Sequence, residues 1–84
     1  MLSETDAEGG RLLWRCRRGM KELDVVLDRF ARSAIPALSQ EGRATLAAFL
    51  ELPDPVLAGY LLHGERPPEP EYARLVGAIL SASV

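Results

Sequence analysis

The sequence predicts an all-α protein, a compact bundle of five short helices. Apolar residues recur at spacings of three and four in five successive segments, as they do on the buried face of a helix. Proline, glycine and N-cap signals separate these segments. No stretch shows the sustained alternation of apolar and polar residues that is typical of strands. The 84 residues allow one domain with a thin core, because a short chain buries a small share of its surface.

The first two expected helices meet at Gly19. The apolar residues of the first share one helical face: Leu12, Leu13, Cys16 and Met20. Those of the second follow the same periodicity: Leu23, Val26, Leu27, Phe30 and Ala34. Glycine costs about 1 kcal/mol relative to alanine inside a helix, but it is favoured just past a helix end, where a positive φ is needed. We therefore expect Gly19 to end the first helix and to begin a tight turn.

The last three helices are bounded by local start and stop signals. Pro36 ends the second helix, because proline disfavours a helical residue before it, and Ser39 is the expected N-cap of the third. Asp54 as N-cap, with Pro55 at the first helical position, predicts the start of the fourth helix, and Gly64 closes it. The apolar faces are Leu46, Phe49 and Leu50 in the third helix, Leu57, Tyr60 and Leu61 in the fourth, and Tyr72, Leu75, Val76, Ile79 and Leu80 in the fifth.

Residues 1–10 are expected to form a flexible lead-in to a single helical domain over residues 11–84. This opening is acidic and ends in two glycines, unlike a secretory signal or an arginine-rich transit peptide. No stretch approaches the roughly 20 apolar residues that a membrane-spanning helix needs. We therefore expect a cytoplasmic protein that does not insert into a membrane.

Charge is unevenly distributed along a chain whose net charge is −2. Residues 11–32 carry seven basic and three acidic groups, a local balance of +4, so the remainder carries −6. A basic face on an acidic protein could steer it toward an acidic partner surface or toward nucleic acid. The ordinary alternative, a solvated helix face, fits the composition equally well.

The charged junction from Arg17 to Asp24 is the candidate functional site. Gly19 would leave a flat patch that the backbone of another chain can approach, with the guanidinium of Arg18 and the carboxylate of Glu22 beside it. Arg17 and Asp24 are the neighbouring charges. An alternative needs no partner: basic residues at the end of one helix and acidic residues at the start of the next each stabilise the helix dipoles by about 0.3–1 kcal/mol.

Trp14 lies away from the apolar stripe of the first helix and four residues before Arg18. An arginine can stack on an indole at that spacing, and both residue types are enriched at binding hot spots. Trp14 is therefore either a partner-binding residue or a cover for the edge of the bundle.

The sequence shows little that could carry catalysis. It contains no Gly-x-Gly-x-x-Gly, no phosphate-binding loop and no recognisable nucleophile. The single cysteine, Cys16, falls on the apolar stripe and is expected to be a buried, inert thiol. The single histidine, His63, stands in the last turn of the fourth helix without a second metal ligand beside it. We therefore expect no catalytic residue and no metal site.

Two segments of the chain match the motifs of a known family. The first is the run Trp14-x-Cys16-Arg17-Arg18-Gly19-Met20-Lys21-Glu22-Leu23-Asp24, which contains Arg-Gly-x-x-Glu as Arg18, Gly19 and Glu22. The second reads Asp54-Pro55-x-Leu57-x-x-Tyr60-Leu61, followed by His63-Gly64, and the two together span about residues 11 to 64, most of the chain. The first segment resembles the signature of the succinate dehydrogenase FAD assembly factors, small helical proteins marked by Arg-Gly-x-x-Glu, and the second is similar to the later block of that family.

The resemblance implies an accessory protein that promotes covalent attachment of FAD to a histidine of the flavoprotein subunit of succinate dehydrogenase, and in some organisms of fumarate reductase. Both the histidine and the FAD belong to that partner, so this chain would hold no cofactor tightly. The partner-binding residues would be Arg18, Gly19 and Glu22, with Arg17, Asp24 and Trp14 as neighbours. They would hold the partner where its histidine and the flavin meet in reactive geometry.

Two other classes of function stay open. A nucleic-acid-binding helical domain would use the basic segment 11–32 and a helix-turn-helix around Gly19, although the acidity of the whole chain argues against it. A flavin-binding transferase would bind FAD itself. Salt-dependent binding to duplex DNA would indicate the first class, and saturable quenching on titration with FAD would indicate the second.

Overall fold

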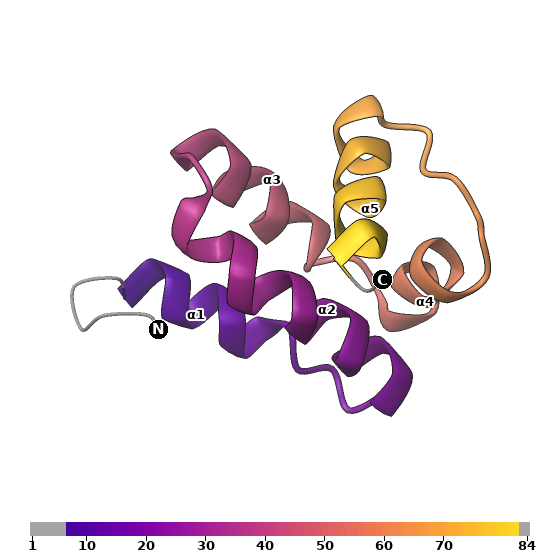
Figure 1. Ribbon diagram of the computed structural model, residues 1–84. Helices are drawn as coiled ribbons and strands as arrows, with labels where there is room; N and C mark the ends of the chain where they lie inside the picture. The colour runs from indigo at the N-terminus through magenta and orange to yellow at the C-terminus, as the bar shows by residue number, and fades with distance from the viewer. Residues whose placement is uncertain (1–6, 83–84) are drawn as a thin grey trace.

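The computed structural model describes residues 7–82, and within them it contains five α-helices, one 3-10 helix and no strand. The prediction of an all-α bundle of five helices is therefore confirmed. Figure 1 shows the helices in chain order. Their bounds are α1 Ala7–Arg15, α2 Lys21–Ala34, α3 Gln40–Phe49, α4 Asp54–Leu62 and α5 Pro70–Ala82, with the 3-10 helix η1 at Ile35–Ala37.

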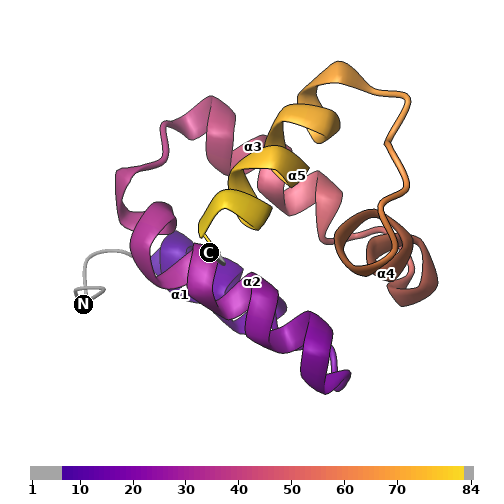
Figure 2. The same cartoon turned by 45° about the vertical axis from the view of Figure 1, so that its right-hand side comes forward.

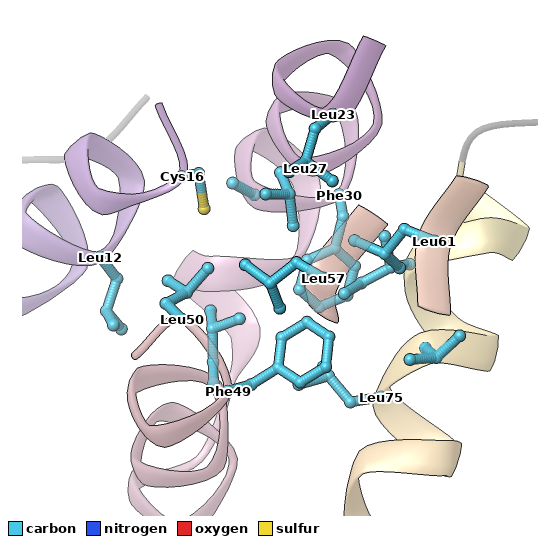
Figure 3. Close-up of a cluster of buried hydrophobic side chains, with 14 of the residues drawn as sticks. Leu12, Cys16, Leu23, Leu27, Phe30, Phe49, Leu50, Leu57, Leu61 and Leu75 are labelled. Atoms are coloured by element: carbon cyan, nitrogen blue, oxygen red, sulfur yellow. The ribbon is translucent and has the colours of Figure 1, made fainter. Parts of the chain in front are cut away.

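The central element of the bundle is α2, because it packs against α1, α4 and α5. In both views α1 lies alongside α2 (Figure 1 and Figure 2). Leu23 and Leu27 of α2 are fully buried, as are Phe49 of α3, Leu57 of α4 and Ile79 of α5. Figure 3 shows side chains of this cluster meeting between the helices. The apolar faces that the spacing predicted therefore form one common core.

The first helix begins earlier than the sequence predicted. We expected a flexible lead-in through residue 10, but Gly9 and Gly10 lie inside α1, and Gly9 is buried. The packing of α1 against α2 and α3 offsets the low helix propensity of two consecutive glycines. Residues 1–6, the rest of the expected lead-in, lie outside the described residues.

The first helix also ends earlier than predicted, at Arg15, so that Arg17 and Arg18 lie beyond its carboxyl end rather than in its last turn. Met20, which we placed on the apolar stripe of this helix, is 39% exposed, because the chain leaves the helix before reaching it. The predicted turn at Gly19 is confirmed, since this residue has a φ of +87°.

The start of α3 is fixed by Ser39, as predicted. The amide of Gly42 donates a hydrogen bond of 3.1 Å to the Ser39 hydroxyl oxygen. Ser39→Ala is expected to lower the free energy of unfolding by about 1 kcal/mol, because the amide loses its partner. Ser81→Ala is a matched control, since Ser81 is exposed in α5 and its loss should change that free energy by less than about 0.5 kcal/mol. Urea unfolding measures the free energy of unfolding of both variants. An equal change in the two variants would show that the cap does not stabilise α3.

The start of α4 differs from the prediction. Pro53 is the N-cap residue, Asp54 is the first helical residue and Pro55 follows at the second position. The carboxylate of Asp54 is instead bound by Arg18, from the loop between α1 and α2. This long-range pair explains why the local N-cap signal was wrong. At the other end, Gly64 closes α4 as predicted, with a φ of +73°.

The remaining boundaries follow the sequence signals. The second helix ends where η1 begins, with Pro36 inside η1 as the predicted break. In α5, Leu75, Val76 and Ile79 are buried, as their spacing predicted. Leu80 is 37% exposed, so its prediction as a core residue was wrong. It lies at the edge of the apolar face rather than within it.

Within residues 7–82, no single helix is long and apolar enough to cross a membrane. Helices α3 and α4 meet the length and composition requirement only as a pair, and their axes are bent by 112° at the break between them.

Candidate functional site

The loop between α1 and α2, residues 16–20, is here called the junction loop, and Asp24 fastens it to α2. The backbone amides of Arg18 and Gly19 donate hydrogen bonds of 2.7 and 3.2 Å to the two carboxylate oxygens of Asp24. The amide of Asp24 in turn donates to the carbonyl of Met20 at 2.8 Å. The predicted contact residue Asp24 therefore has a role inside the chain, which is to set the path of the loop.

Arg18 fastens the same loop to the turn between α3 and α4. Its Nε donates to Asp54 Oδ1 at 2.8 Å. Its Nη1 donates to the carbonyls of Arg15 and Leu50 at 3.1 and 2.9 Å, and its Nη2 donates to that of Leu52 at 3.4 Å. Two of these carbonyls belong to the carboxyl ends of α1 and α3, which lack partners within their own helices and carry partial negative charge. Arg18 thus joins the carboxyl end of α1 to the turn between α3 and α4, which lies 32 to 36 positions away in the sequence.

Little of the Arg18 guanidinium is left for an outside contact. It makes four hydrogen bonds within the chain, one fewer than the five N–H donors it has, and its side chain is 18% exposed. We predicted that this guanidinium would flank the docking patch. The structure gives it a positioning role in addition, and a contact between Arg18 and a partner stays a prediction.

Gly19 lies exposed at the surface of the junction loop. Its φ of +87° favours glycine, since other residues adopt this conformation rarely. A Cβ atom built on Gly19 would meet no atom of the chain within 4 Å. The backbone therefore favours a glycine at this turn, while the space outside it is open to an approaching surface.

Trp14 of α1, Arg17 of the junction loop and Glu22 of α2 are all exposed. The guanidinium carbon of Arg17 lies 5.9 Å from the centroid of the Trp14 ring, and Trp14 is 71% exposed. We expected Arg18 to be the stacking residue. That expectation was wrong, because α1 ends at Arg15 and the chain then turns Arg18 toward the α3–α4 turn. Glu22 stands in the first turn of α2, and its carboxylate makes no hydrogen bond or ion pair with a described residue.

Cys16 is buried in the core, as predicted, and Figure 3 shows it among the labelled core side chains. Burial raises the pKa of its thiol from 9.0 to about 11, against a smaller lowering by the charge of Arg18. Between these two values the folded chain keeps a proton that the unfolded chain has lost, so stability should fall as the pH rises from 9 to 11. Cys16→Ala should remove this part of the pH dependence, as urea unfolding at pH 8, 9.5 and 11 can measure; identical slopes in both proteins would contradict it.

The part of the chain that the structure describes contains no group of three His, Cys, Asp or Glu side chains that could hold a metal ion. His63 is exposed at the C-cap of α4, at the position that the sequence indicated. Sequence reasoning missed the pairing of Arg18 with Asp54. No local signal could have found it, since 36 positions separate the two residues.

Comparison with known proteins gives consistent results. A family model described as "Flavinator of succinate dehydrogenase" matches residues 10–83. A protein named FAD assembly factor SdhE from Shewanella oneidensis is 41% identical over 66 residues, which cover 79% of this chain and 80% of that protein. Proteins of the same name from Pseudomonas aeruginosa and Coxiella burnetii are 36% identical over 80 residues and 33% identical over 73 residues. These cover 95% and 87% of this chain, and 93% and 89% of the relatives.

The matched region contains all five helices from the second turn of α1 onward, together with the junction loop and the turn that holds Arg18. The similarity therefore extends over the fold and the candidate site alike, rather than over a short motif. On this evidence, the chain belongs to the family described as flavinators of succinate dehydrogenase.

Proposed function

We propose that this chain is an assembly factor that binds the flavoprotein subunit of succinate dehydrogenase and promotes the covalent attachment of FAD to it. Membership in the flavinator family carries the proposal, and the relatives named FAD assembly factor support it. We extend the proposal to the flavoprotein of fumarate reductase, in organisms that have this enzyme. The chain would act in the cytoplasm.

The junction loop is the proposed docking site. Gly19 would meet the backbone of the partner, while Glu22, Arg17 and Trp14 would contact the partner around it. All four are exposed, which supports this assignment. Arg18 and Asp24 would act mainly by holding the loop in one conformation, since their polar groups bind the α3–α4 turn and the loop amides. A loop fixed before binding loses little conformational entropy when it docks.

The chemical contribution of the chain would be orientation rather than catalysis. A fixed surface pressed against the flavoprotein would hold its histidine near the flavin, and holding two reacting groups in place can lower a barrier by about 7–11 kcal/mol. The flavin itself would supply the reactivity. In this proposal FAD stays with the partner, and the chain has no catalytic residue of its own.

Co-expression of the flavoprotein subunit with and without this chain tests the proposal. Covalent flavin is measured as fluorescence of the denatured subunit on a gel. We expect strong fluorescence only when the chain is present, and equal fluorescence in both samples would overturn the proposal. Titration of FAD against the isolated chain tests the alternative that the chain is a flavin-binding transferase. That alternative predicts saturable quenching of fluorescence as FAD binds.

The nucleic-acid alternative is less well supported by the arrangement of charges. Of the basic groups in segment 11–32, Arg18 is bound to carbonyls and to Asp54, and Arg32 is paired with Asp28 at 2.7 Å. Arg17 lies over the Trp14 ring. Asp54 lies outside the segment and therefore offsets one charge of the local balance of +4, in which Asp28 is already counted. A nucleic-acid partner is not part of the proposed function. Absence of binding to duplex DNA at low salt would remove this alternative.

A further inference from the structure

A groove runs along the seam between α1 and α2, next to the junction loop. It consists of two adjoining hollows of about 240 and 170 Å³ that share Arg17, Asp28 and Arg32 in their lining. Trp14 lines the smaller hollow, and Val25 lines the larger one. We call these two hollows together the seam groove. The Arg-Gly-x-x-Glu motif includes none of the residues with which α2 lines this groove.

Exposed apolar side chains gather at this place. In the described part of the chain, four large apolar side chains are exposed: Trp14 at 71%, Val25 at 45%, Met20 at 39% and Leu80 at 37%. The first two line the seam groove, and Met20 belongs to the adjoining junction loop. Only Leu80 lies elsewhere, on α5. Exposed apolar groups that cluster beside a groove mark a surface that another molecule covers.

The charges around the groove already have partners within the chain. Asp28 and Arg32 pair at 2.7 Å, Asp24 accepts hydrogen bonds from the amides of the junction loop, and Arg17 lies over Trp14. A partner group bound in the groove would therefore gain little binding energy from carrying a charge. It would gain most by burying an apolar side chain against the tryptophan and the valine, since aromatic residues dominate interface energetics.

We propose that the flavoprotein inserts an apolar side chain into the seam groove, in which Trp14 lines one hollow and Val25 the other, when it docks on the junction loop. The inference rests on the proposed function and extends the docking surface from the motif to Val25, Asp28 and Arg32 on α2. The groove is continuous with the proposed docking site, because Arg17 belongs to the junction loop and also lines both hollows. This continuity supports the flavoprotein as the molecule that fills the groove. The partner that covers Gly19 would reach the groove without a gap.

Val25→Asp tests the groove, and Leu80→Asp is its matched control. Both changes place a carboxylate on an exposed apolar position of a helix, one inside the groove and one outside it. Binding to the purified apo-flavoprotein is measured by titration. We expect Val25→Asp to weaken binding at least about tenfold, as loss of an interface anchor does, and Leu80→Asp to change it less than about twofold. Val25→Arg should weaken it as much, which excludes charge repulsion as the cause.

Trp14 offers a second measurement, because it is the single tryptophan of the chain. Incorporation of 5-fluorotryptophan gives one fluorine resonance, which should shift when unlabelled apo-flavoprotein is added to the wild-type chain. The shift should require about tenfold more flavoprotein with Val25→Asp. Circular dichroism verifies that each variant remains helical, and Val25→Thr serves in place of any variant that does not.

The outcomes separate the groove from the function. Wild-type affinity for both Val25 variants, with an unchanged fluorine resonance, would overturn the groove proposal. If Gly19→Arg still abolished binding in that case, the proposed function would stand without the groove. Wild-type affinity for Gly19→Arg as well would remove the junction loop as the docking site. The proposed function itself would fail only if the wild-type chain did not bind the flavoprotein or did not raise its covalent FAD.

Discussion

A chain carrying Gly19→Arg is expected to fold and yet to leave its flavoprotein without covalent FAD. A Cβ atom at this position would meet no atom of the chain within 4 Å, so the first atom of the new side chain creates no internal clash. The positive φ at this position costs a residue other than glycine about 1–2 kcal/mol, which is small against a typical stability of about 5–15 kcal/mol. The side chain would instead project from the junction loop and hold the partner away. Flavin fluorescence of the denatured flavoprotein, after co-expression, measures the effect.

Gly64→Arg is the matched control for this experiment. Gly64 is also exposed, has a φ of +73° and has open space around its Cβ position, but it lies between α4 and α5. The two variants therefore carry similar backbone strain in different places. We expect covalent FAD to be formed at the wild-type level with Gly64→Arg and to be nearly absent with Gly19→Arg. Equal labelling with both would show that Gly19 serves the turn and not the contact.

Arg18→Ala is expected to lower the free energy of unfolding by about 2–4 kcal/mol. The substitution leaves the Asp54 carboxylate without its cation and removes donors from the carbonyls of Leu50 and Leu52. The Arg18 side chain is 18% exposed, so water can replace these bonds only in part. Urea unfolding monitored by circular dichroism gives the difference.

Arg17→Ala is the control for this prediction, because Arg17 is exposed and its recorded contact is with the Trp14 ring. A cation–π contact at an exposed site contributes about 0.5–1 kcal/mol. Arg18→Lys keeps the charge but lacks the planar fork that reaches several acceptors, so it should fall between the two. If Arg18→Ala and Arg17→Ala had the same stability, Arg18 would not hold the loop as described.

Local features of the fold were predictable because their causes lie within a few residues of each other. The Ser39 cap involves Gly42, three positions on, and the positive φ of Gly19 and Gly64 follows from the absence of a side chain. The periodic apolar residues identified the buried faces for the same reason. Pro36 likewise ended its helix by its own geometry.

Contacts between residues that lie far apart in the sequence determined the features that the sequence could not predict. Asp54 is of a residue type that favours the N-cap position, but Arg18, 36 positions away in the sequence, donates a hydrogen bond to its carboxylate. The early end of α1 has a related cause, since the amides after it bind Asp24 instead of continuing the helix. The turn at Gly19 was placed correctly along the chain, while its role as a docking site stays a prediction. The division of its charges into exposed and internally bound groups required the structure.

The attachment of the junction loop to the α3–α4 turn bears on how this surface could be imitated. A synthetic peptide copying residues 11–24 would include the glycine and every charge around it, but it would lack the carbonyls of Leu50 and Leu52 and the carboxylate of Asp54. Its arginine would then be free to rotate, and the turn would populate many shapes in water. An effective mimic or inhibitor would need a built-in constraint, such as a cyclic linkage, in place of the second half of the protein.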